Sequence, residues 1–182
     1  MPNFPIHSVE TAPADSKPIL SAVEKQMGFL PNLLGMFAES PVALDAYTTV
    51  MDIFERSSFS NAEKQTILLT ASHVNGCDYC MAAHSTLAGM KRVPGDIIEA
   101  LRSGARLSDP KLEALAALTR SIVETRGWPD ETIRDAFFAA GYAPSQYLEV
   151  VVGVTVKTLT NYSNHAAGTP LDVAFEPARW AA

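Results

Sequence analysis

The sequence has little of several features that mark whole classes of protein. It holds 2 cysteines in 182 residues, too few for the disulfide scaffold of a small secreted domain. It has no cluster of Lys or Arg and a net charge of -6, so neither nucleic acid nor an anionic membrane surface is an expected partner. No apolar stretch could span a bilayer, and the N-terminus lacks the pattern of a secretory signal. We therefore expect a cytoplasmic protein.

The composition, by contrast, provides enough apolar material for a folded core. Hydrophobic residues make up 47% of the chain and charged residues 19%, which excludes disorder as the default state. The length suits one compact domain over residues 1–182. Within it we expect an extended lead-in over 1–16, a core over about 42–125, and a C-terminal helix and tail over about 143–182.

Glycines, prolines and capping residues divide the chain into segments of helical length. Ser40-Pro41 and Asp109-Pro110 are typical helix starts, and Ser60 with Glu63 forms a capping-box pattern. The expected helices cover residues 17–27, 32–39, 41–56, 61–75, 78–88, 94–102, 110–126 and 130–140.

The last long segment, residues 147–168, has features of both a strand and a helix. Its β-branched run from Val150 to Val156 favours a strand, but no second strand candidate exists to pair with it. Helical spacing instead connects Leu148, Val151, Val152, Thr155, Leu159 and Tyr162. We therefore predict a buried helix ending at Gly168, an irregular tail from Thr169, and an all-α fold.

The stretch NGCDYCMAAH, Asn75 to His84, holds both cysteines and one of the 4 histidines. If Gly76 ends one helix and the next begins beside Cys77, the free N–H groups of that helix start stabilise a thiolate. The spacing of Cys77 and Cys80 places both sulfurs on one face. His84 lies one turn after Cys80 and can exchange a proton with it. This arrangement favours redox chemistry, in which the thiolate of Cys80 attacks the oxidant and Cys77 then condenses with the resulting sulfenic acid to form the disulfide.

Two other interpretations of the same stretch stay open. Cys77, Cys80, His84 and His73 could form a zinc clip, although structural zinc sites usually bring a second ligand pair from elsewhere in the chain. The cysteines could also be inert core residues. Haem attachment is excluded, because Met81 rather than a histidine follows Cys80.

The stretch FSNAEKQTILLTASHVNGCDYCMAAHSTLAGM, Phe59 to Met90, resembles the core of the AhpD-like alkylhydroperoxidases in the carboxymuconolactone decarboxylase superfamily. The segment KTLTNYSNHAAGTPLDVAF near the end is similar to peroxidase-related members. The resemblance implies an AhpD-like helical domain that forms homo-oligomers and acts as a peroxiredoxin-type antioxidant oxidoreductase without cofactor or metal. It also implies a hydroperoxide substrate, and a dithiol or a thioredoxin-like or lipoyl-bearing partner as reductant.

By position, the resemblance makes Cys80 the peroxidatic cysteine, Cys77 the resolving cysteine and His84 the histidine of the proton relay. The relay of the family includes a glutamate where this chain has Gln65. An amide can orient a neighbour but cannot exchange a proton as a carboxylate does. Gln65 is therefore expected to orient His84, or another group supplies the base. Glu63 is a possible relay residue, although the capping box explains it without catalysis.

Four further residues are candidates of second rank. His73 lies near the end of the helix before the motif, where capping is at least as good an explanation as catalysis. Tyr79 either shields the thiolate or packs. Asn161 and His165 form a polar strip on the last helix, lining a pocket or an interface, with a satisfied buried histidine as the favoured interpretation of His165.

Two hypotheses compete with the thiol oxidoreductase. One is a zinc-stabilised interaction module. The other is a lactone-ring decarboxylase or isomerase of the same superfamily, with His84 and Glu63 as acid and base. The lactone decarboxylases generally lack the pair of cysteines, and this makes decarboxylation the weaker alternative for this chain.

Overall fold

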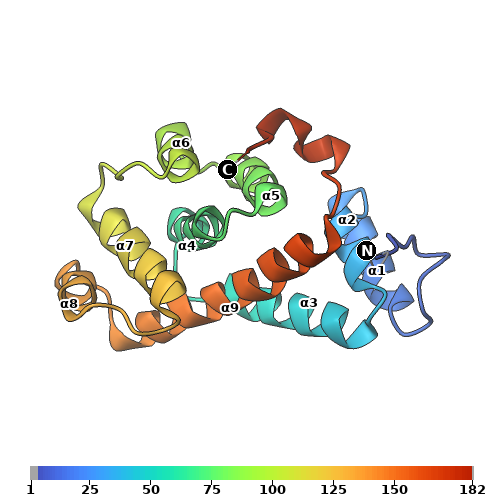
Figure 1. The fold of residues 1–182 in the computed structure, drawn as a ribbon, viewed down its shortest axis with the longest axis horizontal. Helices are drawn as coiled ribbons and strands as arrows, with labels where there is room; N and C mark the ends of the chain where they lie inside the picture. Colours follow the sequence, from blue (N-terminus) through green and yellow to red (C-terminus); the bar gives the residue numbers. More distant parts are fainter. Residues whose placement is uncertain (1–3, 182) are drawn as a thin grey trace.

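The computed structural model describes residues 4–181, and over this range the chain forms helices and no strand (Figure 1). The all-α prediction is confirmed. The elements are α1 (Lys17–Met27), α2 (Asn32–Phe37), α3 (Pro41–Glu55), α4 (Asn61–Val74), α5 (Asp78–Met90), α6 (Gly95–Ser103), α7 (Pro110–Thr125), α8 (Glu131–Ala139), α9 (Pro144–Ala167) and a 3-10 helix, η1 (Val173–Ala178).

The helix starts that the sequence indicated carry the expected caps. The side chain of Ser40 accepts a hydrogen bond from the backbone of Ala43, and Ser60 and Glu63 form the reciprocal capping box. Two predictions at the other ends were wrong. Helix α5 continues through Gly89 to Met90, because Gly89 keeps a helical backbone and the chain reverses only at Arg92 (φ 60°). The tail, expected to be irregular, contains η1.

Helix α4 lies at the centre of the molecule and packs against α5, α7 and α9 (Figure 1). Helix α9 runs along the molecule beside α3, with α8 at one end and the N-terminal helices α1 and α2 at the other. After α9 the tail returns across α5 through η1. The start of α5 is thus enclosed by α9, the tail and the N-terminal helices.

The buried face of α9 differs from the stripe that helical spacing indicated. Leu148, Val151 and Tyr162 are exposed in the chain by itself. Apolar side chains occur almost all round the first half of α9, so periodicity could not select its inward face. The buried residues of α9 are Val150, Gly153, Val156, Lys157, Thr160, Asn161 and Asn164. Its second half therefore presents polar groups to the core.

None of the helices within residues 4–181 is long and apolar enough to cross a lipid bilayer.

Candidate redox site

Both cysteines lie at the turn between α4 and α5. Gly76 adopts the left-handed conformation (φ 62°), which lets the chain reverse after α4. The backbone N–H of Cys77 then donates to the carbonyl of Ser72 at 3.0 Å. Cys77 is the N-cap of α5 with an extended backbone, and Cys80 follows in the first turn. The sequence placed the motif correctly at a helix start.

The polar half of α9 covers the two sulfur atoms. The amide nitrogen Nδ2 of Asn164 donates to Cys80 Sγ at 3.3 Å and lies 3.8 Å from Cys77 Sγ. Cys80 Sγ lies 3.8 Å from the hydroxyl oxygen of Thr160, one turn earlier on α9. Both thiols are free and buried. The two cysteines therefore share one hydrogen-bond donor, Asn164, and both are buried beneath α9.

The two thiols differ in acidity. Burial alone would raise the pKa of Cys80, but the hydrogen bond from Cys77 and the ammonium group of Lys157 outweigh it, and this pKa lies well below the usual range. The pKa of Cys77 is raised, first because its thiol donates to Cys80 and then because it is buried. Cys80 is consequently the thiolate of the pair and Cys77 the thiol.

His84 lies one turn beyond Cys80 on α5 and is buried. Burial, together with the positive charges of Lys157 and Lys91, holds the pKa of His84 well below its usual range. Its imidazole is therefore neutral at pH 7 and a weak base. This restricts the role predicted for His84, because a neutral ring can relay a proton but cannot supply the positive charge that a thiolate needs.

A cavity of about 520 Å³ opens beside Cys80, with His84 and Lys157 in its wall. Much of the wall is apolar and comes from the N-terminal helices, α3 and the tail, for example Val23, Met27, Leu34, Met51 and Phe175. Pockets that take small organic molecules have this size and this character. Cys80 thus faces a chamber large enough for an organic substrate.

Tyr79, between the two cysteines, connects the motif to the wall of this cavity. Its hydroxyl donates to Asp172 Oδ2 at 2.5 Å and accepts from the backbone N–H of Leu33 at 3.2 Å. Asp172 Oδ1 also accepts from the backbone N–H of Asn32 at 3.0 Å. Tyr79 therefore holds α2 and the tail in place as well as packing beside the thiols.

The two candidates for the relay lie in different places. Gln65 is buried on α4, and no hydrogen bond joins it to His84 within residues 4–181. Glu63 accepts from the backbone of Ser60 at 2.8 Å and lies 3.5 Å from the ammonium group of Lys111. The capping role of Glu63 is confirmed, and Glu63 does not line the cavity beside Cys80.

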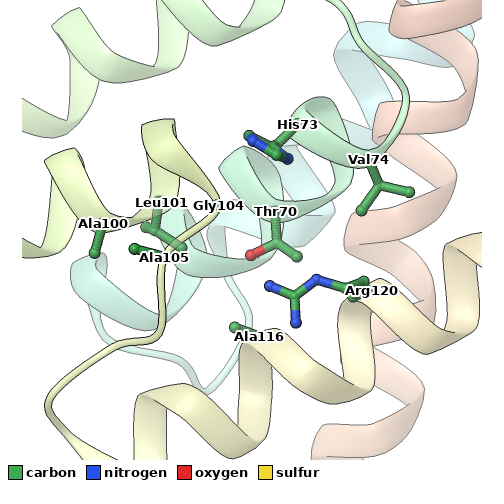
Figure 2. Close-up of a pocket in the computed structure, with 9 residues that line it drawn as sticks. All are labelled: Thr70, His73, Val74, Ala100, Leu101, Gly104, Ala105, Ala116 and Arg120. Atoms are coloured by element: carbon green, nitrogen blue, oxygen red, sulfur yellow. The ribbon is translucent and has the colours of Figure 1, made fainter. Parts of the chain in front are cut away.

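The other histidines and Asn161 lie away from the sulfur atoms. His73 lines a separate pocket of about 10 Å³ between α4, α6 and α7, as Figure 2 shows, and its ring contacts Trp180. The favoured interpretation of His165 as a buried histidine was wrong, because His165 is exposed and stacks on Tyr162. Asn161 is buried but accepts from Asn75 at 2.9 Å rather than contacting a cysteine.

The zinc-clip interpretation needs ligands that come together. Within residues 4–181 no group of three or more His, Cys, Asp or Glu side chains is arranged to hold a metal ion. His73, the fourth ligand considered from the sequence, lies in the separate pocket of Figure 2.

The central part of the chain can be matched to a known family. Residues 41–121 match the family model described as the carboxymuconolactone decarboxylase family. The match covers 81 of the 182 residues and shows a likeness of the central part of the chain to this family. The match includes α3 to α5 with both cysteines, and leaves out α1, α2 and α9.

Several solved structures share the fold over nearly the whole chain. A peroxidase-related protein with an alkylhydroperoxidase AhpD core from Ralstonia eutropha JMP134 is 17% identical, with a TM-score of 0.85 over 95% of this chain and 93% of that one. A peroxidase-related protein from Silicibacter sp. TM1040 is 18% identical, with a TM-score of 0.81 over 96% and 92%. A variant of the debrominase Bmp8 in complex with 2,3,4-tribromopyrrole is 16% identical, with a TM-score of 0.81 over 98% and 95%.

These likenesses show an AhpD-like helical fold, and no curated protein matches the sequence significantly.

The sequence interpretation missed Lys157, Thr160 and Asn164. All three lie on the buried side of α9. A signal was present, because polar residues recur at helical spacing in an otherwise apolar segment. Asn161 and His165, the residues predicted from the sequence, lie on the neighbouring side of the same helix.

Proposed function

We propose that the protein is a thiol-dependent oxidoreductase that reduces an organic hydroperoxide through Cys80 and Cys77. One observation carries the proposal: Asn164 lies against both sulfur atoms, 3.3 Å from Cys80 and 3.8 Å from Cys77, beside a cavity that reaches Cys80. The two sulfurs are therefore neighbours, and the one with the lowered pKa faces the cavity. The likeness of the fold to a peroxidase-related protein with an alkylhydroperoxidase AhpD core supports the same chemistry.

The reaction starts with the thiolate of Cys80 attacking the terminal oxygen of the hydroperoxide. The O–O bond breaks, an S–O bond forms, and the leaving alkoxide takes up one proton to become an alcohol. His84 lines the same cavity and is the group that relays this proton from solvent. Cys80 is now a sulfenic acid, oxidised by two electrons, and the peroxide has been reduced by two.

Cys77 completes the reaction. Its sulfur attacks the sulfenic sulfur of Cys80, an S–S bond forms, and the hydroxyl group leaves as water with the thiol proton. The two sulfurs lie against the same amide nitrogen of Asn164, and this closeness favours Cys77 over an external thiol. An external dithiol, or a thioredoxin-like or lipoyl-bearing protein, then reduces the disulfide by exchange.

A second candidate is reductive dehalogenation by the same pair of thiols. The apolar cavity beside Cys80 favours it, because the cavity is large enough for an aromatic ring, and a debrominase shares the fold. Two thiols and an aryl bromide yield the arene, bromide, a proton and a disulfide. Cys80 and Cys77 keep the same roles, so the two candidates differ only in which oxidant consumes the thiols.

The variant Cys77→Ser tests the assignment of roles. It is expected to react once with an organic hydroperoxide and to stop as a sulfenic acid on Cys80, because no second thiol can close the disulfide. Trapping with a sulfenic-acid reagent and peptide mapping would locate the label on Cys80. Continued turnover of Cys77→Ser at the wild-type rate with a dithiol would contradict the resolving role.

A further inference from the structure

Three polar residues of α9 converge on one thiol of an otherwise apolar core. Lys157, Thr160 and Asn164 follow at intervals of three and four residues, and this spacing places them on one face of the helix. Two of them reach Cys80 Sγ, Asn164 at 3.3 Å and Thr160 at 3.8 Å. The third, Lys157, lines the same cavity as Cys80. None of the three belongs to the segment that matches the family model.

Lys157 is unusual among the lysines of the chain. Its side chain is 1% exposed, and within residues 4–181 no carboxylate forms an ion pair with it. Lys64 and Lys91, also near α3, both pair with Glu55, at 3.9 Å and 2.5 Å. A buried ammonium group is costly without a nearby anion. The thiolate of Cys80 is the anion that the structure offers.

The residues that the sequence indicated as a relay cannot supply a positive charge to the thiolate of Cys80. Position 65 holds an amide, which carries no charge and takes up no proton. His84 is buried beside two lysines, and its imidazole is neutral at pH 7. Glu63 is occupied in the capping box at the far end of α4. Of the two lysines in the wall of the cavity, Lys91 is paired with Glu55 and Lys157 is not, so the positive charge available to a thiolate comes from α9.

We propose that Lys157 is a positioning residue that keeps Cys80 ionised, with Asn164 and Thr160 donating hydrogen bonds to the sulfur. In this way α9 favours the ionised form of Cys80 in a chain that has Gln65 at the position of the relay glutamate. The inference rests on the proposed function in one respect, namely that the thiolate held here is the one that attacks the oxidant. The hydroxyl of Thr160 donates to the carbonyl of Val156 at 3.1 Å and lies 3.8 Å from Cys80 Sγ, within reach of a hydrogen bond to the thiolate.

Other charged or titratable groups face this site from each packed element. They are Tyr47, Asp52 and Glu55 of α3, Cys77 before α5, Tyr79 and His84 of α5, Lys91 after α5, and Asp172 of the tail. Asp52 pairs with Arg56 at 3.2 Å. Glu55 and Lys91 neutralise each other, and Asp172 is bound by Tyr79 and the backbone of α2. Lys157 is thus the cation among these groups that, within residues 4–181, has no carboxylate within ion-pair distance.

The interaction between Lys157 and the thiolate of Cys80 also affects the stability of the disulfide. Once Cys80 is bonded to Cys77 it carries no negative charge, and Lys157 loses its partner. Lys157 therefore stabilises the reduced protein more than the oxidised one, and this makes the disulfide easier for an external dithiol to reduce. A buried lysine without a carboxylate partner is therefore useful in both steps, the attack by the thiolate and the reduction of the disulfide.

The test is the pH profile of Cys80 alkylation by iodoacetamide, read by peptide mapping in the wild type and in Lys157→Met. The midpoint is expected to rise by about one to two pH units in the variant, because its methionine keeps the volume and loses the charge. Lys157→Arg should restore a low midpoint. Lys64→Met is the matched control, a buried lysine outside the cavity, and should leave the midpoint unchanged. A wild-type midpoint in Lys157→Met would overturn the inference.

A second readout separates this inference from the proposed function. In a glutathione redox buffer, Lys157→Met is expected to shift the disulfide equilibrium about tenfold or more toward the oxidised form, since one pKa unit corresponds to a factor of ten. If Lys157→Met does not fold, Asn164→Leu, which removes the donor to Cys80, should shift both readouts in the same direction. If the pH profiles of alkylation shift but a peroxide forms no disulfide, the role of Lys157 is supported and the peroxidase function is refuted. If a peroxide forms the disulfide but the pH profiles do not shift, the peroxidase function is supported and the role of Lys157 is refuted.

Discussion

Replacing Cys80 with serine is expected to lower peroxide consumption by a factor on the order of 10³ or more, because the attacking thiolate is lost. A hydroxyl group in the same place stays protonated at neutral pH and is a far weaker nucleophile for the O–O bond. The measurement is the loss of an organic hydroperoxide in the presence of a dithiol.

Cys77→Ser is the matched control for this experiment. Both variants remove one buried sulfur from the same turn, so both disturb the packing to a similar degree. Only Cys80→Ser should lose the first, single-turnover reaction with the peroxide. Full peroxide consumption by Cys80→Ser would show that Cys80 is not the attacking group.

Gly153→Ala is expected to destabilise the fold by about 1–3 kcal/mol, because a methyl group has no room where α9 crosses α3 and α4. An added Cβ would lie 2.7 Å from Cγ2 of Ile67 and 2.8 Å from Cε2 of Phe54. Both neighbours are fully buried, so neither can move aside at low cost. Urea denaturation, followed by circular dichroism, measures the change in the free energy of unfolding.

Gly89→Ala provides the comparison within the same chain. Gly89 lies near the end of α5 with nothing within 4 Å of an added Cβ, and it keeps a helical backbone. Alanine should therefore stabilise α5 by about 0.5 kcal/mol. Equal stability changes in the two variants would contradict the close approach of α9. Because α9 carries Lys157 and Asn164, Gly153→Ala should also raise the midpoint of Cys80 alkylation.

The helices and the motif were predictable because their signals are local. Ser60 with Glu63, Asp109 with Pro110, and the glycines after the helices each act within one turn of the chain. The place of Cys77 and Cys80 at a helix start follows from Gly76, which makes the turn before them. These features depend on neighbours in sequence, so no knowledge of the tertiary structure was required.

What surrounds the cysteines depends on contacts between distant segments. Asn164 reaches Cys80 across 84 positions, and Asp172 reaches Tyr79 across 93. The orientation of α9 was ambiguous because apolar residues occur on several of its faces, and it is set by the packing of Gly153 against Phe54 and Ile67. The sequence pattern therefore predicted the nucleophile but not the groups that hold its charge.

The N-terminal helices illustrate the same limit. Helix α1 lies at the expected residues, and α2 begins at Asn32 as expected but ends at Phe37 rather than Glu39. Nothing local indicated that Val23 and Leu34 line a cavity beside Cys80. That contact follows from the hydrogen bonds that join Tyr79, Asp172 and the start of α2. The cavity is thus a property of three separated segments.

The central claim is that Cys80 and Cys77 act together as a two-electron redox pair. Its most direct test is a count of free thiols in fully reduced protein after one equivalent of an organic hydroperoxide, with a brominated pyrrole as the parallel oxidant. We predict the loss of both thiols and an intramolecular disulfide between Cys77 and Cys80 with at least one of the two oxidants. Retention of both thiols with both oxidants, or oxidation of Cys80 without the disulfide, would contradict the claim.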